Sequence, residues 1–280
     1  MLKLLKYDQP VLPAKVTEMS LFPYAGAHAV QSAAFALEWP VELSEVELSS
    51  IAGLHEKLRP SLPNSAPLQT MTFQVVAGQP GSPISAAGGH SFSRPGPAGP
   101  ARLLEVQRNR VVGQVNDYTR WEPVWKEVRN WLSLVGPIIG TRQITHVGLQ
   151  YNDVFHWRGN PQSLDLKQVF AEGSPLLPSN VFKLQGLWHS HHGYFLERSE
   201  PVQHRLLENV NVSMLEELGQ RSILISLVHK AAVADIWGWE SMSKVIDGLM
   251  DDLHKRNKIM LGDLLSSEAA ESIGLLKESK

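Results

Sequence analysis

The chain has 280 residues, of which 43% are hydrophobic and 19% charged, and this composition describes a globular protein rather than a disordered one. The formal net charge of −2 excludes a global field that would recruit nucleic acid, and the absence of cysteine excludes disulfides, thiolate metal sites and a cysteine nucleophile. No stretch approaches the ~20 apolar residues of a membrane span and no signal-peptide pattern is present, so we expect a cytoplasmic protein with no membrane partner.

The first part of the chain is expected to combine strands with short helices. Residues 29–39 predict a strand. Ser44 and Glu47 have the spacing of a capping box, which predicts the start of a helix that Pro60 ends. Residues 68–76 alternate apolar and polar side chains and predict a second strand.

The region that follows is dominated by small residues. Residues 78–100 are almost wholly Gly, Pro, Ser and Ala, which cannot bury enough apolar surface to order themselves, so we predict a mobile surface loop. Residues 103–106 and 111–115 then predict a hairpin. Residues 121–134 carry an aromatic-rich stripe and predict a helix that ends at the Gly-Pro pair after it.

The second part is expected to repeat this order. Residues 143–157, 183–196, 205–215 and 222–234 predict strands; residues 164–170 predict a short helix, 239–259 the longest helix, and a final helix begins at 261 or 267. Short connections between strands favour antiparallel pairing. We therefore predict an α+β fold with mainly antiparallel sheets in two similar halves, each with one main helix packed on the sheet. The halves span residues 27–160 and 161–280, after an N-terminal extension over residues 1–26.

Two histidines form the most chemically suggestive motif. Trp188-His189-Ser190-His191 resembles the His-x-His string of JAB1/MPN metalloproteases, and on a strand His189 and His191 would share one face. That family completes its zinc site with an aspartate, but Val202 stands at this position. A catalytic zinc needs three protein ligands, so a zinc hydrolase is kept as an alternative and no cofactor is expected in the leading interpretation.

The long helix over residues 239–259 carries acidic residues and a histidine at helical spacing. Asp247, Asp251, Asp252 and His254 are interpreted as a solvated face, opposite the apolar face of the helix. Most tryptophans stand beside aliphatic residues and are assigned to the core. Trp121 differs, because it begins its helix between Arg120 and Glu122 and need not be fully buried, so it is a candidate for binding a partner.

Basic residues gather in sequence around the predicted hairpin. Arg108, Arg110 and Arg120 are the candidate binding residues of this group, which could hold an anionic ligand. A salt-dependent affinity for nucleic acid through these arginines is a third interpretation.

Several strings together resemble a known family. Residues 103–110 are followed by Tyr118-Thr119-Arg120-Trp121-Glu122, by residues 144–153 and by a late helix with residues 253–258. In these strings the chain resembles the sporadically distributed family of uncharacterised bacterial proteins, over roughly residues 27–275. The family has no assigned catalytic residues. Its patchy occurrence implies an accessory or phage-defence locus.

The leading interpretation is a non-enzymatic subunit or sensor that binds another protein, or a second copy of itself. A chain without a convincing catalytic constellation is better explained by binding than by turnover. Exposed strand edges are the expected contact surfaces, because they offer unpaired backbone groups.

Overall fold

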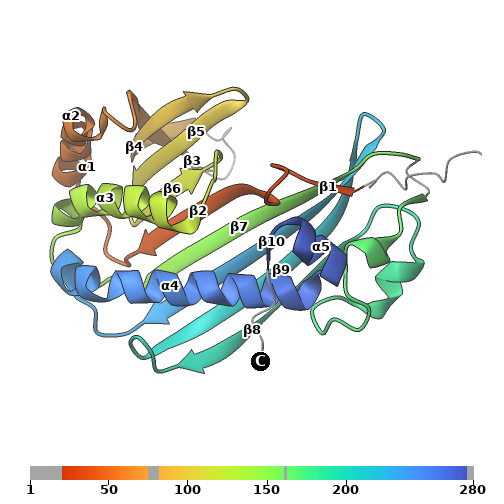
Figure 1. The fold of residues 1–280 in the computed structure, drawn as a ribbon. Helices are drawn as coiled ribbons and strands as arrows, with labels where there is room; N and C mark the ends of the chain where they lie inside the picture. The colour runs from red at the N-terminus through yellow and green to blue at the C-terminus, as the bar shows by residue number, and fades with distance from the viewer. Residues whose placement is uncertain (1–20, 75–81, 161–162, 276–280) are drawn as a thin grey trace, which may run out of the picture.

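The computed structural model describes residues 21–74, 82–160 and 163–275 and shows an α+β protein built on one ten-stranded sheet (Figure 1). Each strand pair in this sheet is antiparallel. The predicted α+β class with mainly antiparallel pairing is therefore confirmed.

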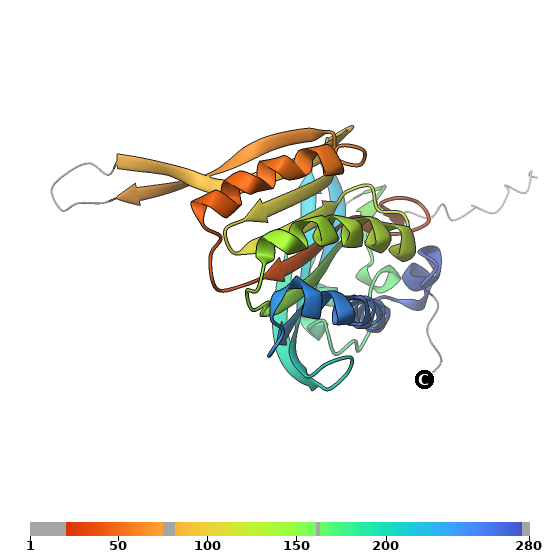
Figure 2. The same cartoon turned by 90° about the vertical axis from the view of Figure 1, so that its left-hand side faces the viewer.

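The strand order places β3 and β8 at the two edges of the sheet. The strands are β1 (Leu21–Pro23), β2 (Val30–Glu38), β3 (Asn64–Gln74), β4 (Ser82–Gly96), β5 (Gly99–Gln107), β6 (Arg110–Val115), β7 (His146–Trp157), β8 (His189–Arg198), β9 (His204–Glu217) and β10 (Gln220–Val233). Their order across the sheet is β3-β4-β5-β6-β2-β7-β10-β9-β8, and β1 pairs with the end of β7. The β3–β4 hairpin extends away from the helices (Figure 2).

The helices lie on one face of this sheet (Figure 1). They are α1 (Glu45–Ile51), α2 (His55–Leu58), α3 (Trp121–Ile139), α4 (Gly238–Leu264) and α5 (Ser267–Ser272), with short 3-10 turns at Ala52–Leu54, Leu166–Gln168 and Ser179–Lys183. On β7, Val147, Leu149 and Tyr151 are buried beneath them, whereas Gln150 and Asn152 point to the opposite face. This alternation follows from the two-residue period of a strand. No helix of the described residues covers the opposite face, which is therefore called the open face below.

The start of α1 follows the predicted capping box. The Ser44 hydroxyl accepts a hydrogen bond from the Glu47 amide, and the Glu47 carboxylate accepts one from the Ser44 amide. Both satisfy amide groups that a helix start leaves without partners. Leu48 and Ile51 then bury one face of α1 in the core that lies over β4.

The predicted mobile loop over residues 78–100 is wrong from residue 82 onward, because this segment is mostly β4, which pairs with β3 from Ser82 and also with β5 from Gly89. Residues 78–81 lie outside the described residues. The small side chains have a packing reason. Gly89 lies so close to β5 that a Cβ there would fall on the Val106 carbonyl oxygen, and Phe92 contributes a large buried side chain. The composition of this segment predicted a loop, whereas the structure has a strand whose second part is crowded between β3 and β5.

Helix α3 continues past the Gly-Pro pair that was expected to end it, and stops only at Ile139. The absence of a side chain at Gly136 serves packing, because a Cβ there would fall on the indole ring of Trp239 from α4. The amide of Gly140 still bonds the Gly136 carbonyl, so Pro137 is tolerated in the last turn.

Other predicted boundaries also change in the second part of the chain. The strand predicted over residues 183–196 begins only at His189, and the predicted helix over 164–170 is a single 3-10 turn. Leu21–Pro23, within the predicted N-terminal extension, joins the sheet beside β7. Among the described residues, no helix is long and apolar enough to cross a membrane.

Candidate functional site

The predicted arginine patch is divided between the two ends of β6. Arg108 lies in the β5–β6 turn, where its guanidinium is 2.5 Å from the Glu45 carboxylate, and Arg110 begins β6. Arg120 lies beyond the other end of β6, at the start of α3. The strand from Arg110 to Val115 spans about 17 Å at ~3.4 Å per residue, so Arg120 does not lie with the other two.

The two histidines of the His-x-His motif lie on β8, where both are exposed on the open face. A ring nitrogen of His191 is 2.9 Å from the side-chain oxygen of Asn209 on β9. Ser213 is opposite His189, and Val202 packs against the core. Within the described ranges, no group of three or more His, Asp or Glu is placed to hold a metal ion.

Trp121 lies in the seam between α3 and α4. Its indole ring stacks on His254, with ring centroids 4.3 Å apart and planes 3° from parallel. Its Nε1 donates to Asp251 at 2.9 Å, and Trp125 Nε1 donates to Asp247 at 3.0 Å. The two tryptophans are four residues apart on α3, and the two aspartates are four residues apart on α4. Each pair therefore lies on one face of its helix, and the two faces meet because the helices run antiparallel.

The acidic stretch of α4 is therefore not simply the solvated face that was predicted. Asp247 and Asp251 keep much of their exposure but accept the indole protons, and Asp252 pairs with Arg198 at 2.9 Å. His254 points into the protein, where its Nδ1 lies 3.1 Å from the Tyr151 hydroxyl. Burial, assisted by the charge of Lys258, lowers the pKa of His254 to about 4.

An unpaired carboxyl lies beneath this seam. Asp153 of β7 is fully buried, and neither carboxyl oxygen has a hydrogen-bond partner among the described residues. Burial raises its pKa to about 7. Tyr118 and Tyr151 are its neighbours, with hydroxyl oxygens 3.4 Å apart, and burial raises the pKa of Tyr118 to about 12. Such perturbed groups often mark functional sites, although structural networks also produce them.

A second buried polar group lies farther along the same face. Glu208 of β9 is fully buried and receives two hydrogen bonds of 2.7 Å from Arg256 of α4. The buried ring of His229 on β10 lies 3.5 Å from Glu208. Burial raises the pKa of Glu208, but the bonds from Arg256 and the nearby His229 outweigh it and lower the value to about 2. This carboxylate is therefore held in its charged form beneath α4.

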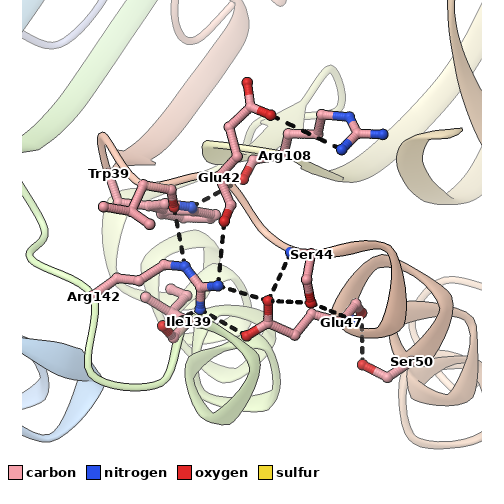
Figure 3. Close-up of polar contacts among 9 residues, drawn as sticks. Trp39, Glu42, Ser44, Glu47, Ser50, Arg108, Ile139 and Arg142 are labelled. Carbon is pink, nitrogen blue, oxygen red and sulfur yellow. Dashed lines mark hydrogen bonds and ion pairs between the residues drawn. The ribbon is translucent and has the colours of Figure 1, made fainter. Parts of the chain in front are cut away.

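Arg142 forms a saturated polar cluster at the opposite end of the helices (Figure 3). Its guanidinium donates to both carboxylate oxygens of Glu47, at 2.8 and 2.6 Å, and also to the backbone carbonyls of Val41, Glu42 and Ile139. The donors of Arg142 are used within the protein. The cluster therefore links α1 to the end of α3 and is not a ligand site.

The outer strand β8 offers a different kind of site. Its ten residues pair with β9 along one side only, and no described strand pairs with the other side. Large apolar side chains are exposed on β8, on the segment before it, near the end of β9 and in the β9–β10 turn: Leu184, Leu187, Phe195, Leu215 and Leu218. An edge strand with exposed apolar side chains can add a strand from another chain.

Comparisons with known proteins give no relative: neither a family model nor a curated protein matches the chain.

Proposed function

We propose that the protein is a non-enzymatic binding subunit or sensor that takes up a strand of a partner protein along β8. The observation that carries this proposal is the long outer edge of β8, which has no pairing strand among the described residues. Main-chain hydrogen bonds along such an edge supply affinity, and the alternating side chains supply specificity.

The sequence of β8 supports this assignment. Natural edge strands are commonly protected by proline, by lysine or by a bulge. His189–Arg198 contains neither proline nor lysine, and its pairing with β9 continues over all ten residues without a register shift. The charged pair Glu197–Arg198 lies only at one end. Along the rest of the edge, no strand of the described residues occupies the place of a partner strand.

The order of strands also supports an acceptor role. The proposal treats the sheet as two similar halves, in which β2 and β7 are the central strands and β6 and β10 lie beside them. Counting outward, β4 then corresponds to β8. An additional strand, β3, pairs with β4, whereas no described strand takes the corresponding place beside β8. A partner strand would occupy this place, antiparallel to β8.

An exposed leucine in a strained conformation lies in the turn between β9 and β10, five residues beyond Ser213, which is opposite the first residue of β8. Leu218, in the β9–β10 turn, is 99% exposed and has φ of 50°, followed by Gly219 with φ of 77°. Two positive φ values favour Asn-Gly in a two-residue hairpin turn, and leucine is unfavourable there. Local stability does not explain this leucine, but contact with a partner would.

The partner is proposed to be another protein of the bacterial accessory or defence system that the family resemblance implies. No cofactor takes part. One tightly held zinc per chain that is lost in His191→Ala would contradict the proposal and support the zinc hydrolase.

The test compares edge variants of the full chain, tagged and purified from the native host. Phe195→Lys places a charge on the β8 edge and should remove the co-purifying partner. Leu218→Asn should weaken partner recovery while the melting temperature stays level or rises, so unfolding cannot explain the loss. Ala66→Lys on the exposed part of β3 is the matched control and should retain the partner.

Recovery that is equal for Phe195→Lys and Ala66→Lys would overturn the proposal, as would a native preparation with no stoichiometric partner. If the only partner is a second copy of the chain, sedimentation will show a dimer that Phe195→Lys dissociates.

A further inference from the structure

A hollow of ≈ 380 Å³ opens at the end of β2 and β6, far from the edge strand β8 in the order of the sheet. The β4–β5 turn, residues 96–101, forms one wall. Side chains from the other elements complete it: Tyr24, Gln31, Ser32, Gln114, Asn116 and Asp117. This volume lies within the range of small-molecule sites.

The wall formed by the β4–β5 turn is closely packed and bonded to the residue that follows β6. A Cβ at Gly96 would approach the Ala101 Cβ and the Gly99 carbonyl oxygen to 3.0 Å each, and Gly99 has φ of 121°. Asn116 fastens this turn to β6, because its side-chain amide donates to the Pro100 carbonyl at 2.7 Å. The position of this wall is therefore supported by contacts within the protein itself.

A chain of amide groups on the open face ends at the hollow. Gln150 donates to Ser226 and to the side-chain oxygen of Asn152, and Asn152 donates to the Ser32 hydroxyl oxygen at 2.9 Å. The Ser32 oxygen thus receives a proton from one side. Its own hydroxyl proton has no acceptor among the described residues, so it can be donated to a ligand.

Two glutamines add further polar groups. Gln31 occupies the shift in register between β2 and β7, is exposed, and has no hydrogen-bond partner among the described residues. A β-bulge of this kind redirects a side chain and is frequent beside binding sites. Gln114 donates to Asn116 at 2.9 Å, which leaves its side-chain oxygen available as an acceptor within this part of the chain.

The hollow is close to neutral. Among the described residues, no Lys or Arg lines it, and the one carboxylate that does, Asp117, is paired with Arg94 at 2.8 Å and with Arg102 at 2.6 Å. A ligand with a phosphate or a free carboxylate would therefore find no unpaired cation. The available groups are neutral donors and acceptors beside the ring of Tyr24, which is 44% exposed.

We propose that this hollow binds a nucleobase, as the free base or the nucleoside. A side-chain amide places a donor beside an acceptor, which matches the adjacent donor and acceptor on the edge of a base, as Asn and Gln do with adenine. The Tyr24 ring would stack on the face of the base. Gln31 and Gln114 would read its edge, and the Ser32 hydroxyl would donate to a ring nitrogen or carbonyl.

The test uses saturation-transfer NMR on the full chain with each of the four ribonucleosides, and with glucose as a neutral hydroxylated control. At least one nucleoside should bind and glucose should not. Tyr24→Ala should weaken that binding about tenfold or more, since stacking on an aromatic side chain contributes ~1–3 kcal/mol per base. Tyr24→Phe keeps the ring and should retain the affinity.

Gln114→Ala removes the free acceptor without touching the aromatic wall and should also weaken binding, at an unchanged melting temperature. Val46→Ala on the exposed side of α1 is the distant control. Absence of binding by all four nucleosides would overturn the proposal, as would glucose binding or nucleoside binding that Tyr24→Ala and Gln114→Ala leave unchanged. None of these outcomes depends on a partner at β8.

Discussion

The two sides of the sheet, the strands from β2 to β6 and the strands from β7 to β10, bury different kinds of side chain beneath their helices. The first side, β2 to β6 with α1 to α3, buries one charged residue, Arg102, among the residues that the structure describes. The second side, β7 to β10 with α4 and its connections, buries six polar or charged residues: Asp153, Ser174, His204, Glu208, His229 and Asn257. The outer edges differ too, since β4 is covered by β3 whereas β8 is not covered by any described strand.

This difference separates stability from function. Apolar burial stabilises the first side directly. On the second side, a buried charge gives little net stability even when paired, and a large penalty when its partner is lost. Elements that bind partners are commonly drawn from less stable parts of a protein. We therefore expect the second side to respond more strongly to pH and to substitution of its polar core, and the first side to act as the rigid support.

The largest effect is expected from Glu208→Gln. The substitution leaves Arg256 without its carboxylate partner beneath α4, which should destabilise the protein by about 3–5 kcal/mol. Urea unfolding at neutral pH measures this change. The control is Glu197→Gln on the same side, because Glu197 and Arg205 are both exposed and 3.7 Å apart, and it should cost less than ~1 kcal/mol. Equal losses of stability in the two variants would show that the buried pair contributes no more than a pair at the surface.

Asp153→Asn should stabilise the protein by up to about 4 kcal/mol above pH 7. The folded pKa of Asp153 is raised from 3.8 to about 7, so the folded state holds a proton that the unfolded state has lost between these values. Stability therefore falls as pH rises from 3.8 to 7, by ~1.4 kcal/mol per pH unit, and is level above. Asparagine does not titrate and should remove this fall. Identical pH profiles of variant and parent would contradict the assignment.

His254 provides an internal check on the same profile. Its folded pKa is lowered from 6.5 to about 4, so between these values the unfolded state binds more protons and stability rises with pH. In the parent protein this rise offsets much of the fall due to Asp153. In Asp153→Asn the rise should no longer be offset, from pH 4 to 6.5, and the double variant with His254→Gln should lose the part of the rise that is due to His254.

On the first side, Arg142→Ala should cost about 2–3 kcal/mol, because it removes the charged donor from the Glu47 carboxylate and from three backbone carbonyl oxygens. The bonds from Arg142, with those from Ser44, lower the pKa of Glu47 to about 2. This stabilisation should therefore be lost as pH falls from 4.5 to 2. Arg108→Ala is the matched control, since Arg108 pairs only at the surface, and thermal unfolding should separate the two. A smaller loss of stability in Arg142→Ala than in Arg108→Ala would contradict the stabilising role of the Arg142 cluster.

Much of the fold follows from local sequence patterns. The capping box at Ser44 and the alternation in residues 143–157 predict α1 and β7 because both depend on neighbours in the chain. The loop predicted over 78–100 failed because the need for Gly89 comes from β5, which composition cannot reveal. Helix α3 was expected to end at Gly136, but the missing side chain there makes room for Trp239, which comes a hundred residues later in the chain.

The sequence pattern contains information on the positions of the buried polar groups. Asp153 shares the parity of Val147, Leu149 and Tyr151, so the alternation already places it on the covered face. Glu208 and His229 pair across the β9–β10 hairpin, whose turn at Leu218 and Gly219 sets their register. The packing of α4 above them could not be predicted, because the partner of Glu208 is set by the position of a helix that the hairpin does not determine.

The smallest effect, and the most direct test of the two edges, is amide hydrogen exchange in the free protein. In an antiparallel pair, alternate residues point their backbone groups away from the partner. About half of the amides in β8 should therefore exchange rapidly, whereas those of β4 between β3 and β5 should be slow. A partner strand on β8 should slow these amides and leave β4 unchanged. Slow exchange along all of β8 at low protein concentration would mean that the edge is already covered within the chain, and the proposed binding site would be lost; protection that grows with concentration would identify a second copy as the strand donor.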